Sequence, residues 1–241
     1  MAGSREKKRD PKASLALLWG EQEQPRRGPK PSLTAGRIVA AAIEIADTEG
    51  MDAVSMQRIA AELDVTTMAL YRYVPGKAEL IDLMVDSALG TPATTDGIPD
   101  DWRSRLTDWA RQCWAKYRRH PWILTATAMR RQLMGPNQLA WLDAALAALS
   151  RTGLPAAQQH DAFLLIVGHI RTLAQQSAAA DEAGEEEWNR LEADVLERHG
   201  HRYPALTAAI TAGAFAPQQG DPLDFGLERI LDGIAALADR A

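Results

Sequence analysis

The residues best suited to chemistry lie together between Thr66 and Lys77, in the run TTMALYRYVPGK. The small side chains at its start allow close approach of the backbone, and a Thr methyl or Ala can contact a thymine methyl. Tyr71, Arg72 and Tyr73 add two hydroxyls and a guanidinium, which reach phosphate oxygens or, for arginine, a guanine edge. Lys77 follows a Pro-Gly break, where its charge and the free N–H groups of a new helix favour a phosphate. These residue types point to recognition of DNA.

The element that must position them is a pair of short helices joined by a turn. Ser55 is a good helix N-cap. The apolar residues after it recur at the spacing of one buried helical face: Met56, Ile59, Ala60 and Leu63. Asp64 tolerates the left-handed backbone that would end this helix, and Thr66 or Thr67 can cap a second helix to about Val74. Two such helices predict a helix-turn-helix, whose second helix enters the DNA major groove.

The candidate DNA contacts lie near the start of the first helix, along the second helix and just after it. They are Ser55, Gln57, Thr66, Thr67, Met68, Ala69, Tyr71, Arg72, Tyr73 and Lys77. The helical pattern alone leaves another interpretation open, in which this segment is a corner of an all-α core with incidental surface Tyr and Arg.

The segment from Arg37 to Leu89 strongly resembles the DNA-binding domain of the tetracycline-repressor (TetR) family of transcriptional regulators. It reads RIVAAAIEIADTEGMDAVSMQRIAAELDVTTMALYRYVPGKAELIDLMVDSAL. The TEG, SMQRIAAEL, LYRYVPGK and ELIDLM segments stand at the family's spacing, and one departure is Asp64, where many members carry Gly. The resemblance implies a three-helix head followed by a helix that links it to a larger body.

Charge is distributed unevenly along the chain. The formal net charge is −5, but residues 1–37 carry nine Lys or Arg against four acidic residues, a net charge of +5, and the other 204 residues carry −10. This asymmetry suits a DNA-binding protein. Because residues 1–31 combine charges and prolines with little periodicity, we expect a flexible basic arm, in which the small apolar cluster from Ala13 to Trp19 either packs on the head or makes no contact. Its Arg26, Arg27 and Lys30 are predicted to contact phosphates or the minor groove, and the alternative is a solvated tail that raises only non-specific affinity.

Composition excludes several other classes of protein. Cys113 is the single cysteine, so an intramolecular disulfide is impossible and a cytoplasmic location is expected. No apolar run approaches the roughly 20 residues of a membrane span, so no membrane partner is expected. We find no catalytic constellation and no cofactor motif. His199 and His201 are two residues apart on a helix end and would not point together, so no metal site is predicted.

The chain divides at GTPATTDGIP, residues 90–99, into a head over residues 32–90 and an all-helical body over residues 100–241. DEAGEEE, residues 181–187, is predicted as an acidic loop before a helix from about Glu187 to His199. HPW at 120–122, GPN at 135–137, RYPAL at 202–206 and FGLERILDGI at 225–234 resemble the TetR-type C-terminal domain, which implies ligand binding and dimerisation.

Two sets of residues in the body are candidates for those functions. An apolar cavity for a planar effector is predicted to be lined by Trp109, Cys113, Trp114, Met129, Trp141, Phe163 and His169, unless these side chains are plain core. Tetracycline itself is not supported, because the family's magnesium–tetracycline ligand set does not carry over. A two-fold interface is predicted at Phe163, Ile166, Val167, Ile170, Leu223, Leu227, Ile230, Ile234 and Leu237, unless these helices are central in a monomer.

The sequence therefore predicts an all-α, two-domain homodimeric regulator. A helix-turn-helix domain would bind a palindromic DNA operator, and a larger helical domain would bind a small hydrophobic or aromatic effector that releases the DNA. An architectural DNA-binding protein without effector control remains an alternative, and a helical enzyme is a less favoured one.

Overall fold

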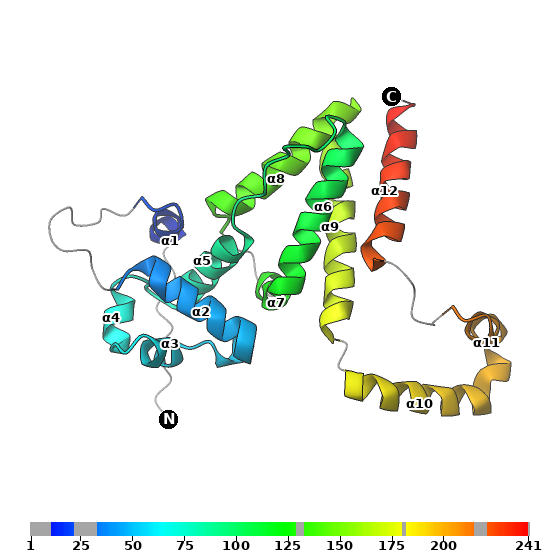
Figure 1. Ribbon diagram of the computed structural model, residues 1–241, viewed down its shortest axis with the longest axis horizontal. Helices are drawn as coiled ribbons and strands as arrows, with labels where there is room; N and C mark the ends of the chain where they lie inside the picture. Colours follow the sequence, from blue (N-terminus) through cyan, green and yellow to red (C-terminus); the bar gives the residue numbers. More distant parts are fainter. Residues whose placement is uncertain (1–10, 22–32, 129–132, 180–181, 215–220, 241) are drawn as a thin grey trace.

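The computed structural model describes residues 11–21, 33–128, 133–179, 182–214 and 221–240, which contain α-helices, short 3-10 turns and no strand (Figure 1). The head contains α1 (Pro11–Leu18), α2 (Ala35–Glu49), α3 (Met56–Glu62), α4 (Thr67–Tyr71) and α5 (Lys77–Leu89). The body contains α6 (Trp102–Arg119), α7 (Trp122–Ala128), α8 (Pro136–Leu149), α9 (Ala156–Ala179), α10 (Glu182–His199), α11 (Pro204–Thr211) and α12 (Pro222–Ala238). The all-α prediction is confirmed.

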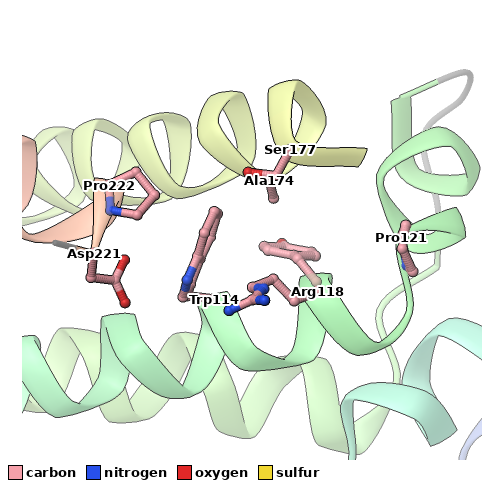
Figure 2. A pocket seen from close by; sticks show the side chains of 8 residues that line it. Trp114, Arg118, Pro121, Ala174, Ser177, Asp221 and Pro222 are labelled. Atoms are coloured by element: carbon pink, nitrogen blue, oxygen red, sulfur yellow. The ribbon is translucent and has the colours of Figure 1, made fainter. Parts of the chain in front are cut away.

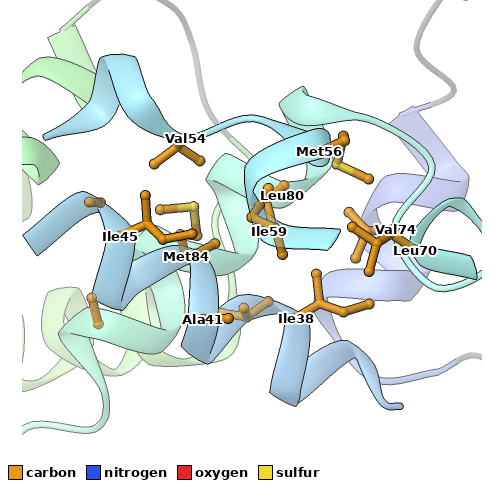
Figure 3. Close-up of a cluster of buried hydrophobic side chains, with 14 of the residues drawn as sticks. Ile38, Ala41, Ile45, Val54, Met56, Ile59, Leu70, Val74, Leu80 and Met84 are labelled. Atoms are coloured by element: carbon orange, nitrogen blue, oxygen red, sulfur yellow. The ribbon is translucent and has the colours of Figure 1, made fainter. Parts of the chain in front are cut away.

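The head is built around one apolar core shared by α2, α3, α4 and α5. Figure 3 shows side chains from these helices meeting in its centre. The fully buried members include Ile38, Ile59, Leu70, Leu80 and Met84. Truncating one such side chain to Ala costs about 2–5 kcal/mol, so this core fixes the recognition helix against the rest of the head.

Residues 11–18 correct the prediction of a flexible arm. They form α1, which packs on α5 and buries Leu17 and Leu18. The Ser14 hydroxyl donates a hydrogen bond of 3.0 Å to the buried Glu79 carboxylate in the first turn of α5. The apolar cluster near Leu17 therefore has a partner within the chain, because α5 supplies both an apolar surface and a polar contact.

The body is organised by α6, α8, α9 and α12, whose apolar faces form a second core. In Figure 1 the helices α6, α9 and α12 run side by side. Several residues predicted at the dimer interface are instead buried in this core, with exposures of 4% or less: Ile166, Ile170, Leu223, Leu227 and Ile234. They contact neighbouring helices of the same protomer, so that part of the interface prediction is wrong.

The acidic segment before Glu187 is helical, which corrects the predicted loop. Helix α10 begins at Glu182. Alanine and glutamate are good helix formers, and acidic residues are favoured in a first helical turn by the helix dipole. Figure 1 shows α10 and α11 extending away from the helices of the body core.

Candidate nucleic-acid interface and cavity

The helix-turn-helix is assembled by local hydrogen bonds. The Ser55 hydroxyl accepts from the Arg58 N–H at 3.1 Å and starts α3. Asp64 ends that helix with φ of 53°, the left-handed geometry that its short polar side chain tolerates. The Thr66 hydroxyl accepts from the Ala69 N–H at 3.3 Å and starts α4. Helix α4 ends at Tyr71, earlier than the sequence pattern indicates.

The recognition helix presents two kinds of side chain. Met68 is 72% exposed and Tyr71 is 45% exposed, whereas Leu70 is fully buried in the head core. Thr66, Gln57, Arg72 and Lys77 are also exposed, while Ser55, Thr67, Ala69 and Tyr73 are half-buried. Tyr73 and Ala69 pack against the head core. Only some of the residues predicted to contact DNA are therefore exposed on the outer surface of the head.

Arg26, Arg27 and Lys30 lie outside the described residues, so their predicted DNA contacts are carried forward as predictions. Lys77 begins α5, and Gly76 before it makes no side-chain cap. The exposed Lys77 thus stands at the positive end of a 13-residue helix, where a phosphate is favoured.

Arg58 is a cation of this unit whose role the sequence did not predict. Its guanidinium donates to Glu49 at 2.8 Å and to Glu62 at 2.7 Å, and these carboxylates hold its pKa above the usual value. Glu62 at i+4 was a visible signal, but Glu49 lies on α2. Arg58 therefore ties α3 to α2 and is already neutralised by its two partners.

A cavity of about 430 Å³ opens between α6, the turn from α6 to α7, α9 and the start of α12 (Figure 2). It is lined by Trp114, Tyr117, Arg118, Pro121, Ala174, Ser177, Asp221 and Pro222. Trp114 is 5% exposed, and its indole nitrogen is buried without a hydrogen-bond partner among the described residues. Burial raises the pKa of the Tyr117 phenol, so Tyr117 stays neutral at physiological pH.

Of the predicted cavity residues that the structure describes, Trp114 lines this space and the others have different surroundings. Trp109 donates to the Trp141 carbonyl at 2.9 Å and lies edge-on to Trp141 and Phe163, as core aromatics do. Trp109 also lines a separate cleft of about 230 Å³ with Arg105 and Arg151 among its walls.

Cys113 and His169 do not line the cavity of Trp114. Cys113 is 8% exposed in the body core, and burial raises the pKa of its thiol, which keeps it protonated and unreactive. The His169 ring is half-buried, with Nε2 at 3.3 Å from the Leu223 carbonyl, and a side chain at Gly226 would overlap it. His169 thus packs α9 against α12. Met129 lies outside the described residues.

Two carboxylates join the head to the body. Asp47 on α2 accepts from His120 Nδ1 at 2.8 Å and from Trp122 Nε1 at 2.6 Å. Asp86 on α5 accepts from the Gln138 N–H at 2.9 Å and from Asn137 Nδ2 at 3.0 Å. These partners are 51–75 residues apart in sequence, so local patterns gave no signal for either joint.

Other negative findings concern only the described part of the chain. Within it, no group of three or more His, Cys, Asp or Glu is placed to hold a metal ion. Among the same residues, no helix combines the length and the apolar character that crossing a membrane would need.

Comparison with known proteins assigns the family. Residues 38–84 match the family model of bacterial regulatory proteins of the tetR family, and residues 92–238 match that of the tetracyclin repressor-like C-terminal domain. The chain is 39% identical over 233 residues to the HTH-type transcriptional repressor DrrR1 of Streptomyces coeruleorubidus, covering 93% of this chain and 85% of that protein. The chain belongs to the TetR family of transcriptional regulators. The predictions of family, fold class and DNA-binding regulatory function are confirmed.

Solved structures give the regulator the same architecture. Apo ActR from Streptomyces coelicolor superposes with a TM-score of 0.72 at 25% identity, covering 88% of this chain and 99% of that chain. ActR in complex with actinorhodin superposes with a TM-score of 0.70 at 27% identity, covering 86% of this chain and 97% of that chain. Both similarities extend over the head and the body of the regulator.

Proposed function

We propose that the regulator is a cytoplasmic homodimeric repressor, without enzymatic activity, that binds a palindromic operator and is released by a small aromatic effector. The observation that carries the proposal is the recognition helix. Leu70 anchors it in the head core, while Met68 and Tyr71 are exposed beside Arg72 and Lys77. Outward residues on a rigid helix can read base edges in a major groove. The similarity to DrrR1, which is named a repressor, supports repression rather than activation of transcription.

Dimerisation is proposed on the outer face of α9 and α12. Leu164, Leu165 and Phe225 are 51%, 62% and 72% exposed, which is unusual for large apolar side chains on packed helices. A cleft of about 450 Å³ next to Leu165 is lined by both helices, including Ile230 and Leu237 of the original prediction. A two-fold axis would place the same apolar surface on both subunits, and two heads could then bind successive major grooves.

The effector is proposed to bind beside Trp114 and Tyr117. Their rings, with Pro121 and Pro222, form walls suited to a flat ligand. Leaving the Trp114 N–H unpaired costs about 1–3 kcal/mol, so a ligand oxygen that accepts from it would be favoured. Because this nitrogen is closed off from solvent, the oxygen reaches it only if the cavity wall yields. Exposed Arg118 adds a preference for an acidic group. ActR, which is solved with actinorhodin, supports effector control by similarity.

DNA recognition is tested by selecting bound duplexes from a random-sequence pool and measuring affinity for the selected duplex and for scrambled DNA. We expect a palindromic consensus and a clear preference for it. Weak preference with no consensus would instead support an architectural DNA-binding protein.

The effector site is tested with two compounds of nearly the same shape, anthraquinone-2-carboxylate and anthracene-2-carboxylate. Only the first has ring carbonyls that can accept from the Trp114 N–H. We expect tighter binding of the quinone by calorimetry and release of the duplex when it binds. Trp114→Phe should remove the preference between the two compounds. Equal preference in parent and variant would exclude this role of Trp114.

A further inference from the structure

The turn between α6 and α7 lines the cavity on one side and contacts the head on the other. Trp114, Tyr117 and Arg118 line the cavity from α6, and Pro121 lines it from the turn itself. The residue before Pro121 is His120, which is 6% exposed, and the residue after it is Trp122, also 6% exposed. A molecule in the cavity would therefore lie against a segment whose neighbours face another part of the protein.

Both neighbours of Pro121 contact the same atom of the head. Asp47 Oδ1, in α2, accepts from His120 Nδ1 at 2.8 Å and from Trp122 Nε1 at 2.6 Å. A hydrogen bond to an ionised acceptor is shorter and stronger than a neutral one. The Asp47 side chain is 28% exposed and that of His120 is 8% exposed, so the contact is partly screened from water. These bonds fix the turn relative to the helix that opens the helix-turn-helix domain.

Apolar packing continues the same connection. Trp122 and Ile123 are members of the head core even though they belong to α7. Tyr117, a wall of the cavity, packs against both the head core and the body core. A displacement of this turn would thus shift side chains in the core that holds α4 in place.

The linker helix α5 has a separate attachment to the body. Asp86 receives hydrogen bonds from Asn137 and Gln138, and Trp141 Nε1 donates to the Gly90 carbonyl at 2.8 Å. Lys116 Nζ lies at 3.5 Å from the Ala88 carbonyl. The end of α5 is therefore held by α8 and α6, away from Pro121, and is placed to act as a pivot.

We propose that Asp47 is the positioning residue through which the head senses the cavity. The inference rests on the proposed function and specifies its regulation. A ligand that displaces Pro121 moves His120 and Trp122, and their hydrogen bonds to Asp47 transmit the displacement to α2. The head then turns about the joint at Asp86, and the two recognition helices of a dimer leave the spacing of one operator. Because binding linkage is reciprocal, operator DNA must in turn change the affinity of the cavity for its ligand, and through Asp47 it would do so by displacing the turn at Pro121.

This reciprocity permits a test without any ligand. The full-length protein is labelled with 5-fluorotryptophan, and the ¹⁹F resonance of Trp114 in the cavity is assigned by comparison with Trp114→Phe. The duplex obtained by selection is then titrated in, while anisotropy of labelled DNA measures affinity on the same samples. We expect the duplex to shift the Trp114 resonance in the parent protein and the shift to be lost in Asp47→Ala, which still binds DNA.

The matched control is Glu44→Gln, which removes an exposed carboxylate from the same helix, three residues before Asp47. It should keep the full shift. Asp47→Asn retains an oxygen for the Trp122 N–H and should keep part of it. Circular dichroism checks folding. If Asp47→Ala unfolds, Trp122→Phe replaces it, because Phe keeps an aromatic ring in the head core and removes the N–H donor to Asp47.

The outcomes separate the inference from the proposed function. An undiminished Trp114 shift in folded Asp47→Ala would show that coupling runs by another route, such as the Asp86 joint, and would overturn the inference. Duplex binding by the parent without any Trp114 shift would overturn it as well, leaving DNA-binding regulation intact. Failure of the parent to bind any selected duplex would contradict the proposed function and remove the inference with it.

Discussion

Asp86 Oδ1 accepts a hydrogen bond of 2.9 Å from the backbone N–H of Gln138, so a carboxylate of the linker helix caps the first turn of α8. The N-cap residue of α8 is Gly135, which has no side chain, and a Cβ there would overlap the Asp86 carboxyl. A helix N-terminus favours a negative charge, which partly offsets the burial of Asp86. Head and body are thus joined by a cap that one domain supplies to the other.

Removing this cap should destabilise the protein. Asp86→Ala leaves the half-buried Gln138 N–H without its acceptor, at a cost of about 1–3 kcal/mol. The Asn137 amide loses the carboxylate but keeps the backbone carbonyl of residue 86, at 3.1 Å, as an acceptor. Urea unfolding followed by circular dichroism measures the loss. The matched control is Asp143→Ala, an exposed aspartate later in α8, which should change stability much less. Equal losses in both variants would mean that the interdomain cap contributes nothing specific.

The same carboxylate should leave a signature in the pH dependence of stability. Burial raises the pKa of Asp86 above its usual 3.8, although its hydrogen bonds to Gln138 and Asn137 oppose the shift. The folded state therefore binds this proton more readily than the unfolded state. Its contribution to stability is fully present below pH 3.8 and is lost as the pH rises through the folded-state pKa.

Asp86→Asn removes this titration while keeping the shape of the side chain. The free energy of unfolding of parent and variant is measured in urea from pH 3.5 to pH 7. As the pH rises, the parent should lose stability relative to the variant, by about 1.4 kcal/mol per unit of difference between the folded-state and unfolded-state pKa. A difference independent of pH would show that Asp86 has the same pKa in both states.

Substitutions in and beside the recognition helix should distinguish sequence-specific DNA contacts from contacts that bind any DNA sequence. Tyr71→Ala and Arg72→Ala should each weaken binding of the selected duplex by at least about 1 kcal/mol, because both side chains are exposed on or beside α4. Lys77→Ala should weaken binding to all sequences and lower the slope of log affinity against log salt by about one. Arg190→Ala, which removes an exposed cation on α10, is the control and should bind like the parent.

Much of the head was predictable because its signals are local. Thr34, Ser55 and Thr66 accept from the N–H three residues ahead, and the turn at Asp64 depends on one residue's own conformation. The joints at Asp47 and Asp86 were not predictable, since each unites residues more than 50 positions apart. For the same reason, the apolar cluster from Ala13 to Trp19 left packing on the head open but did not identify α5 as its partner. The sequence also did not distinguish residues of the protomer core from residues of the dimer interface, because apolar side chains are favoured in both environments.

That last ambiguity leads to a paired test of the proposed dimer face. Leu165 and Ile166 are adjacent on α9, yet Leu165 is 62% exposed and Ile166 is 1% exposed. Leu165→Glu would place a charge in a dry subunit interface, so we expect a folded monomer with weakened binding to a palindromic duplex. Ile166→Glu would bury the same charge in the body core, so we expect unfolding.

Sedimentation velocity and circular dichroism on the two variants distinguish these results. An unperturbed dimer from Leu165→Glu would place the interface elsewhere on the regulator. A folded monomer from Ile166→Glu would restore the original prediction that Ile166 contacts the partner, because a side chain required only for the protomer's own core cannot be charged without loss of the fold.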